Sequence, residues 1–186
     1  NQFFLSIVSL IKTIIMAEQQ LVNKVAQSGL ITFDLEQLLK ETDWMLLDLK
    51  PFLVKEMVLM EKPFREAVKE FDWAKYKDKW VGIYCSVDTL VPHWAYMLLT
   101  SELVKAGAKV FFASGDDYQD QKALLKSLIE DLDASHYENK RVILKGCGDL
   151  QLDASFYVAC SQKFLPHVKA LMYGEPCSTV PVYKKP

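Results

Sequence analysis

Three cysteines are the residues of this sequence whose type and position best support chemistry. Cys85, Cys147 and Cys177 each come just after a short apolar run that is predicted to be a strand. Ligands of α/β sheets bind beyond the carboxyl ends of the strands, so thiols at such positions are candidates for one shared site. Thiolates bind metal ions strongly and also act as nucleophiles or redox groups. The pattern therefore directs the search to these strand ends.

A metal centre is the first interpretation of the three thiols. Three thiolates would leave the fourth position of a tetrahedral site to His93, to the carboxylate of Asp88 or Glu175, or to water. Zinc is expected before iron, because zinc accepts mixed sulfur, nitrogen and oxygen ligands without redox chemistry. The predicted metal ligands are Cys85, Cys147, Cys177 and His93.

Two other interpretations of the cysteines stay open. In one, no metal is bound and Cys85 or Cys147 is a nucleophile or redox thiol, whose pKa Lys145 and a helix N-terminus would lower. In the other, the thiols only pack, as most free cysteines do, and the chain is a non-enzymatic binding or assembly module. Cys160 lies within a predicted helix, where core packing is the expected role.

Alternating strands and helices must position these residues. From Trp80 onward, short apolar runs alternate with amphipathic segments, which predicts an α/β fold with a mostly parallel sheet and flanking helices, a βαβαβαβ core. A strand order of 2-1-3-4 would make the first and third strands neighbours and bring the cysteines to one edge. The predicted strands lie near 81–85, 109–113, 141–146 and 168–173, and the predicted helices at 92–104, 119–132 and 154–164.

The segment before this core, up to residue 71, has a different pattern of apolar residues. Short apolar groups at 31–33, 45–47 and 57–60 predict short strands that precede the main sheet. Residues 62–71 predict a helix, with Pro63 suited to a first helical position.

A faint internal similarity supports the same fold. A shift of 61 positions aligns the region around one predicted strand with the region around another. In each region a tyrosine and a lysine precede the strand, and a valine lies within it. Two βαβ units under the same packing rules would look alike in this way, so we take the similarity as support for the fold alone. The aligned residues are Tyr76, Lys79 and Val81 with Tyr137, Lys140 and Val142.

Composition narrows the classes of partner and compartment. The 186 residues are 51% hydrophobic and 25% charged, with a net charge of −2 and no long run of either sign. Nucleic acid is therefore not an expected partner, because phosphate would require a basic face. Lys184 and Lys185 near the end of the chain are expected to be solvated. Four cysteines without a CxxC pair indicate a reducing, cytoplasmic setting, in which a small molecule or a metal ion is the remaining class of ligand.

The first fifteen residues form an apolar stretch that Lys12 interrupts. The stretch is shorter than the roughly 20 residues of a membrane-spanning helix, and it lacks the basic region and cleavage site of a secretory signal. Met16 reads as an ordinary start. We therefore expect residues 1–15 to be an upstream extension, residues 16–186 to form a single α/β domain, and no membrane to be involved.

Familiar catalytic and nucleotide motifs do not account for the chain. Gly146-Cys147-Gly148 lacks the third glycine of a dinucleotide loop, and neither a Walker sequence nor a G-x-S-x-G elbow occurs. The acidic pairs Asp116-Asp117 and Asp131/Asp133 fall at predicted helix ends, where a capping or solvated role is expected. The sequence thus indicates no nucleotide cofactor.

Several of these segments resemble the bacterial family catalogued as domain of unknown function 2480. The likeness is carried by Cys85–Asp88 running into Val91–Tyr96, by Lys145–Cys147, and most specifically by Gly174–Pro181. It extends from Met16 to the C-terminus and leaves out residues 1–15. Because the family's name concedes that its activity is not established, the resemblance implies no reaction and no cofactor.

Overall fold

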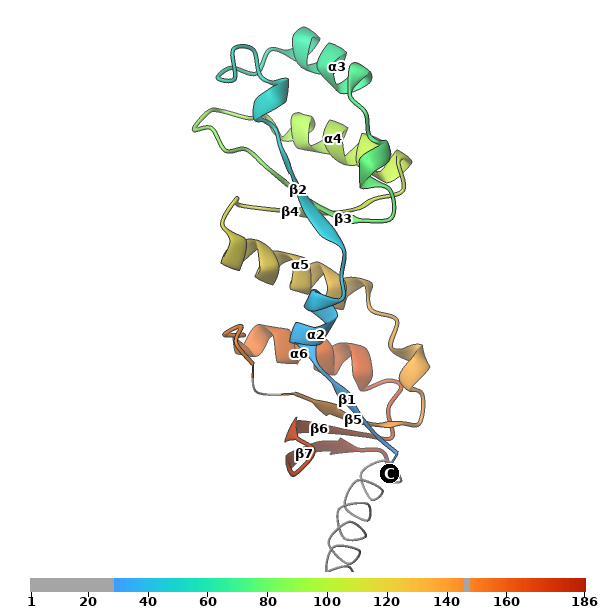
Figure 1. Cartoon of the computed structure of the whole chain (residues 1–186). Coiled ribbons are helices and arrows are strands. Elements are labelled where there is room, and N and C mark those ends of the chain that lie inside the picture. The colour runs from blue at the N-terminus through green and yellow to red at the C-terminus, as the bar shows by residue number, and fades with distance from the viewer. Residues whose placement is uncertain (1–28, 146–147) are drawn as a thin grey trace, which may run out of the picture. The chain divides into compact units, whose positions relative to one another are not determined.

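The computed structural model describes residues 29–145 and 148–186, which divide into two compact units (Figure 1). The central unit is Leu35–Leu132, and the terminal unit combines residues 29–34 with residues 133–186. In the described part of the chain, no helix is both long and apolar enough to cross a membrane. The prediction for residues 1–15 lies outside the described residues, and the single domain over 16–186 stays a prediction.

The central unit is a parallel sheet between two layers of helices. Strands β2, β3 and β4 pair in that order, so that β3 is the central strand. Helices α3 and α4 lie on one side of the sheet, and α2 and α5 lie on the other (Figure 1). The elements are α2 (Leu35–Lys40), β2 (Trp44–Asp48), η1 (Lys50–Phe52), α3 (Glu61–Glu70), η2 (Ala74–Tyr76), β3 (Trp80–Tyr84), α4 (His93–Lys105), β4 (Lys109–Phe112) and α5 (Asp117–Asp131).

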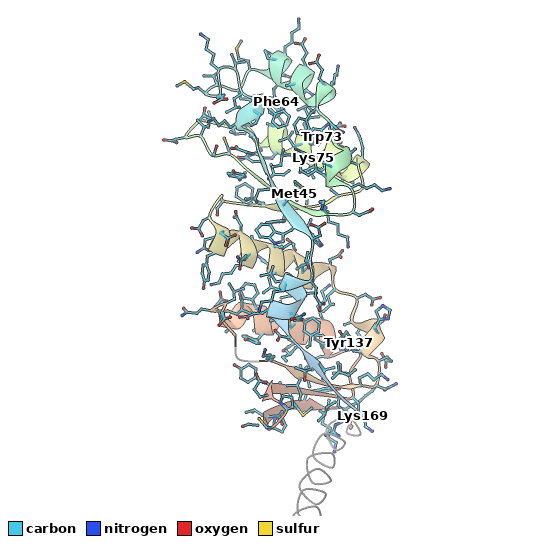
Figure 2. The ribbon with its side chains drawn as sticks, in the orientation of Figure 1. Met45, Phe64, Trp73, Lys75, Tyr137 and Lys169 are labelled. Carbon is cyan, nitrogen blue, oxygen red and sulfur yellow. The ribbon has the colours of Figure 1, made fainter. Side chains whose placement is uncertain are left out.

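The core of the central unit forms where β3 meets α4 and the aromatic residues near α3. Val81 and Ile83 of β3 are buried in one cluster with Leu99 of α4. Phe64 and Trp73, both labelled in Figure 2, join the same cluster. Each fully buried apolar side chain of this size stabilises the fold by roughly 1.5–3 kcal/mol. This burial fixes β3, and with it the residues that follow β3.

The terminal unit has a four-stranded sheet in the order β1-β5-β6-β7. The first three strands are parallel, and β7 pairs with β6 in antiparallel fashion. Helix α6 packs on one face, where the ring centroids of Phe33 and Phe164 lie 4.9 Å apart and those of Tyr157 and Tyr173 lie 5.3 Å apart. The elements are β1 (Leu30–Phe33), η3 (Ala134–Tyr137), β5 (Arg141–Leu144), α6 (Ala154–Phe164), β6 (Ala170–Glu175) and β7 (Ser178–Lys184).

The two units repeat one local structure. In each, a short 3₁₀ helix leads through a left-handed residue into the central strand, which a helix then connects to the next parallel strand. Asp78 has φ 60° and Asn139 has φ 58°, and these positions are paired by the same shift that aligns the sequences. Both residues are of types that tolerate the left-handed region. The similarity in sequence therefore corresponds to a repeated turn and strand.

The α/β class is confirmed, but the predicted strand order is wrong. The first and third predicted strands, β3 and β5, are not neighbours: β3 pairs with β2 and β4, and β5 pairs with β1 and β6. The short N-terminal strands are the cause of the difference. They precede the core in sequence, as predicted, but they are also members of the sheets: β1 pairs in parallel with β5, and β2 pairs in parallel with β3. Local periodicity identifies a strand, whereas its pairing partner depends on contacts between distant residues.

Two local predictions also fail. Residues 57–60 form no strand; instead Val54 and Val58 make an isolated bridge around Lys55 and Glu56, which have φ 51° and 56°. Strand β7 is absent from the prediction, since Pro181 within it removes a backbone donor and makes the segment read as a loop. The helix predicted at 154–164 is confirmed at both ends.

Candidate functional site

Cys85 lies where the sequence places it, at the carboxyl end of the central strand β3. Its half-buried thiol donates a hydrogen bond to the carbonyl oxygen of Val87 at 3.4 Å. Tyr96 of α4 is close enough to respond to it, because burial, and then the charge of Cys85, raise the pKa of Tyr96. Cys85 is therefore part of the sheet edge at which parallel α/β proteins hold their ligands.

The other predicted ligands are distributed over the two units. His93 is exposed at the first residue of α4 in the central unit, and Cys177 is exposed in the turn between β6 and β7 of the terminal unit. Cys147 falls outside the described residues. Among the residues that are described, no three His, Cys, Asp or Glu side chains are grouped to hold a metal ion. The zinc site, with iron as its alternative, stays a prediction because it includes Cys147.

Asp48 joins two loops at the edge of the central sheet. Its Oδ1 accepts hydrogen bonds from the backbone N–H of Lys50 at 2.9 Å and of Ser86 at 3.1 Å, and its Oδ2 accepts one from Ser86 Oγ at 2.5 Å. Partial burial acts to raise the pKa of Asp48, but these hydrogen bonds and the charge of Lys50 outweigh it, so the pKa is lowered. The carboxylate stays ionised and fixes the loop after β3 to the loop after β2.

Asp120 performs a similar role for the loop after β4. Its side chain is fully buried at the start of α5. Oδ1 accepts hydrogen bonds from the backbone N–H of Ser114 at 2.6 Å and from Ser114 Oγ at 2.9 Å, and Oδ2 accepts one from the N–H of Gly115 at 3.0 Å. The loop is therefore tied to its own helix by three hydrogen bonds to one charge.

Tyr84, the last residue of β3, lies near Asp48, Asp120 and the loop after β4. Burial raises the pKa of its phenol, and the charges of Asp48, Asp120 and Cys85 raise it further. Gly115, with φ 85°, lies against the ring so closely that a Cβ there would be 2.8 Å from Tyr84 Cδ2. The carboxylates of Asp48 and Asp120 thus hold loops at this edge, which gives the edge a defined shape.

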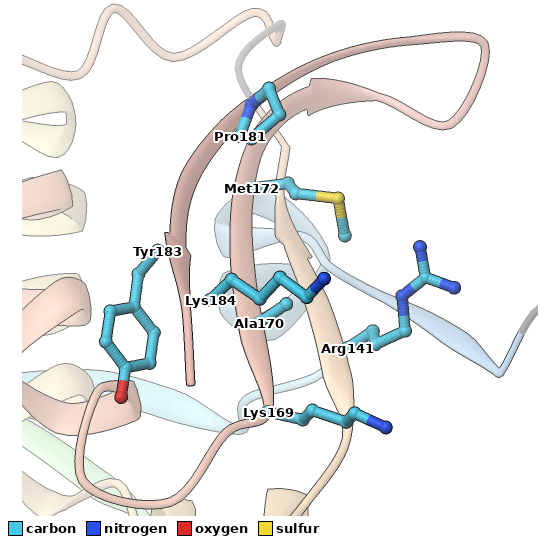
Figure 3. A pocket seen from close by; sticks show the side chains of 7 residues that line it. All are labelled: Arg141, Lys169, Ala170, Met172, Pro181, Tyr183 and Lys184. Atoms are coloured by element: carbon cyan, nitrogen blue, oxygen red, sulfur yellow. The ribbon is translucent and has the colours of Figure 1, made fainter. Parts of the chain in front are cut away.

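A pocket of about 460 Å³ lies on the sheet of the terminal unit (Figure 3). Three cationic side chains contribute to its lining: Arg141 at the start of β5, Lys169 directly before β6, and Lys184 at the end of β7. The rest of the lining is apolar or aromatic. The seven lining residues are Arg141, Lys169, Ala170, Met172, Pro181, Tyr183 and Lys184.

Strand register explains why the cations meet in this pocket. Ala170 of β6 pairs with Arg141 on one side and with Lys184 on the other, which places the small alanine between two charged side chains. Met172 pairs with Pro181, and these two form the next row on the same face of the sheet. Successive residues on one face are roughly 7 Å apart along a strand. The pocket thus has a cationic row beside an apolar row.

The described lining of the pocket carries cationic side chains and no anionic one. Of the described residues that line it, none carries a carboxylate. Nor does the ammonium of Lys169 or of Lys184 lie within ion-pair distance of any acidic group in residues 29–145 and 148–186. Three cations around a concave surface raise the local concentration of anions.

Comparison with protein-family models assigns the sequence to a family. The model of the family described as "Protein of unknown function (DUF2480)" matches residues 19–185, which is nearly the whole chain. The chain belongs to this family. Searches of the curated proteins and of the solved structures found no match. The DUF2480 match includes both units and all the residues that line the pocket.

Sequence reasoning misses this pocket. It treats Lys184 as a solvated terminal lysine and gives no role to Arg141 or Lys169. A signal exists, because each of the three cations stands at the end of a strand or next to one. That signal can be used only if β7 is known to pair with β6. The sequence does not predict this pairing, because Pro181 makes the segment look like a loop. The segment Gly174–Pro181 forms the turn and much of the hairpin that completes the pocket.

Cysteine reactivity gives a first test of the structure. We expect Cys160 to stay unmodified when the native protein meets an alkylating reagent, because its side chain is fully buried and burial raises the pKa of its thiol to about 12. Exposed Cys177 should react rapidly. Mass spectrometry of the digested protein after brief labelling measures both. Denatured protein is the control, and labelling of native Cys160 as fast as Cys177 would show that the core is open.

Proposed function

We propose that this protein binds a small anionic molecule in the basic pocket of its terminal unit. The observation that carries the proposal is the meeting of Arg141, Lys169 and Lys184 around one pocket without an acidic lining residue among those described. Like charges held together repel one another, and a bound anion would remove this cost. The interpretation of the chain as a binding module is therefore favoured over a thiol enzyme.

The lining matches an anion in shape as well as in charge. The planar guanidinium of Arg141 can give two parallel hydrogen bonds to a phosphate or carboxylate, while the lysine ammoniums act as point charges. Ala170 lies between Arg141 and Lys184 in the register, and its short side chain leaves room for the anion above the strand. A pocket of about 460 Å³ falls within the range of small-molecule sites.

We further propose that binding takes place in the cytosol. The described cysteines, Cys85, Cys160 and Cys177, are all free thiols, which a reducing compartment would preserve. The basic pocket does not require the cysteines, so a metal site that includes Cys147 is a separate proposal.

The test compares two double variants of equal net charge. Lys169→Gln with Lys184→Gln removes two cations from the pocket, and Lys62→Gln with Lys126→Gln removes two exposed cations from helices of the central unit. We expect the pocket variant to bind pyrophosphate about 10-fold more weakly than the wild type, since each exposed charge pair contributes up to about 1 kcal/mol.

Isothermal titration at two salt concentrations measures this difference. The control variant should keep the wild-type affinity, and added salt should weaken binding in the wild type more than in the pocket variant. Equal affinities in the two double variants, or no binding of pyrophosphate to the wild type, would refute the proposal.

A further inference from the structure

The pocket joins its cations to an apolar surface on the same face of the sheet. Arg141, Ala170 and Lys184 form one row across β5, β6 and β7. Met172 and Pro181 form the row that follows it along β6. Figure 3 shows Met172 and Arg141 extending toward the same side of the sheet. Charge and apolar surface are therefore offset along the strands, roughly 7 Å apart.

From this offset we infer that the ligand is a phosphate monoester of a short apolar alcohol. The inference rests on the proposed function and adds the chemical class of the ligand. The phosphate lies over Ala170 between Arg141 and Lys184, with Lys169 as a third cation. The apolar group extends over Met172 and Pro181.

Charge favours a phosphate monoester over a carboxylate. Three cations interact more strongly with a group of nearly two negative charges than with a single one, because the Coulomb energy is proportional to the charge of the ligand. The three terminal oxygens of the phosphate can also be shared among Arg141, Lys169 and Lys184, whereas a carboxylate has two oxygens.

Size favours a soluble ligand over a membrane lipid. A volume of about 460 Å³ suits a single small molecule, and among the described residues the apolar and aromatic lining is limited to Ala170, Met172, Pro181 and Tyr183. Two acyl chains anchored in a bilayer would gain little from so short a surface. A phospholipid headgroup carries the same phosphate chemistry, so the experiment includes a vesicle arm to separate the two sources.

The experiment titrates wild-type protein with methyl phosphate and hexyl phosphate, which differ only in the length of the apolar group. We expect hexyl phosphate to bind about 10-fold more tightly, equivalent to about 1.4 kcal/mol, since two of its additional CH₂ groups would be buried on Met172 and Pro181. In the vesicle arm, sedimentation with phosphatidic acid vesicles should recover no more protein than sedimentation with phosphatidylcholine vesicles.

Two variants assign the difference to the pocket. Pro181→Ser changes an exposed residue of β7, and Met172→Ser changes the buried partner of Pro181. In either variant the ratio of the two affinities should fall toward one, because the change weakens the binding of hexyl phosphate more than that of methyl phosphate. If Met172→Ser does not fold, Pro181→Ser decides alone.

Each contrary result has a distinct meaning. Equal affinities for the two esters in the wild type would overturn the inference and leave anion binding intact. A ratio unchanged in Pro181→Ser would also overturn it, because the hexyl group would then lie elsewhere. Specific recovery on phosphatidic acid vesicles would replace the soluble ligand with a lipid. The absence of binding by methyl phosphate, hexyl phosphate and pyrophosphate would refute the proposed function itself.

Discussion

Replacing Asp120 with alanine is expected to lower the free energy of unfolding by about 3 kcal/mol. The fully buried carboxylate accepts two hydrogen bonds from Ser114 and one from Gly115, and alanine accepts none of them. A hydrogen bond to a charged group contributes roughly 1.5–3 kcal/mol, and exposed Ser114 and Gly115 can recover part of the loss from water. The expected sum therefore stays well below three full contributions.

Chemical denaturation of the wild type and of three variants measures this effect. Asp120→Asn keeps the shape but puts an amide N–H₂ group against a backbone donor, so it should lose nearly as much stability as Asp120→Ala. Asp117→Asn is the matched control: Asp117 is on the same helix but exposed, and its loss should cost no more than about 1 kcal/mol. Equal stabilities of Asp120→Ala and Asp117→Asn would show that the buried carboxylate does not hold the loop.

The elements were predictable wherever one local pattern decides them. Helix α6 is amphipathic and begins after Asp153, whose side chain accepts a hydrogen bond from the N–H of Ser155, so its start can be read from sequence. Asp116 and Asp133 cap the helices that follow them, as acidic residues at helix starts are expected to do. These features depend on neighbours within a few positions along the chain.

Sheet membership was not predictable, because it depends on residues far apart in sequence. Four predicted strands that alternate regularly with helices suggest a single sheet. In the structure, however, β1 pairs with β5, and more than a hundred residues separate these two strands in the sequence. The internal similarity around Tyr76 and Tyr137 carried the relevant information. Read as a repeat, it would have required two central strands, each with its own pair of neighbours.

The same distinction applies to the sites. The position of Cys85 at a strand end follows from the strand itself and is confirmed. The role of Asp120 depends on the burial of its own side chain, and the basic pocket depends on the pairing of β7 with β6. At the edge of the central sheet, Asp48 and Asp120 accept hydrogen bonds from the edge's own loops, whereas Lys169 and Lys184 form no ion pair within the described residues. That difference in charge compensation is the reason why we propose a ligand site in the terminal unit.

Replacing Gly174 with alanine is expected to have the second large effect, a loss of about 3 kcal/mol concentrated in the β6–β7 hairpin. Gly174 has φ 117°, a backbone conformation that residues other than glycine rarely adopt. A Cβ there would lie 2.5 Å from the backbone oxygen of Ser178, across the antiparallel pair. Because that neighbour is backbone, it cannot rotate away as a flexible side chain could.

Gly107→Ala separates the clash from the cost of positive φ. Gly107 has φ 88°, but a Cβ there would meet only Lys77 Cγ, at an ordinary 3.6 Å. It should therefore cost only the conformational part, roughly 1–2 kcal/mol. If the two variants are equally stable, the contact with Ser178 contributes nothing.

Amide hydrogen exchange shows where the loss in Gly174→Ala is located. Strand β7 pairs only with β6 in the described sheet, so it can detach while β1, β5 and β6 stay paired. Exchange should accelerate at the amides of β7, such as Val180 and Tyr183, and stay slow at Val142 in β5. Detachment of β7 also removes Pro181, Tyr183 and Lys184 from the pocket, so the affinity for pyrophosphate should fall with hairpin protection. Full protection of β7 in this variant would contradict the expected strain, and unchanged affinity for pyrophosphate in a variant whose β7 has detached would show that the pocket does not depend on β7.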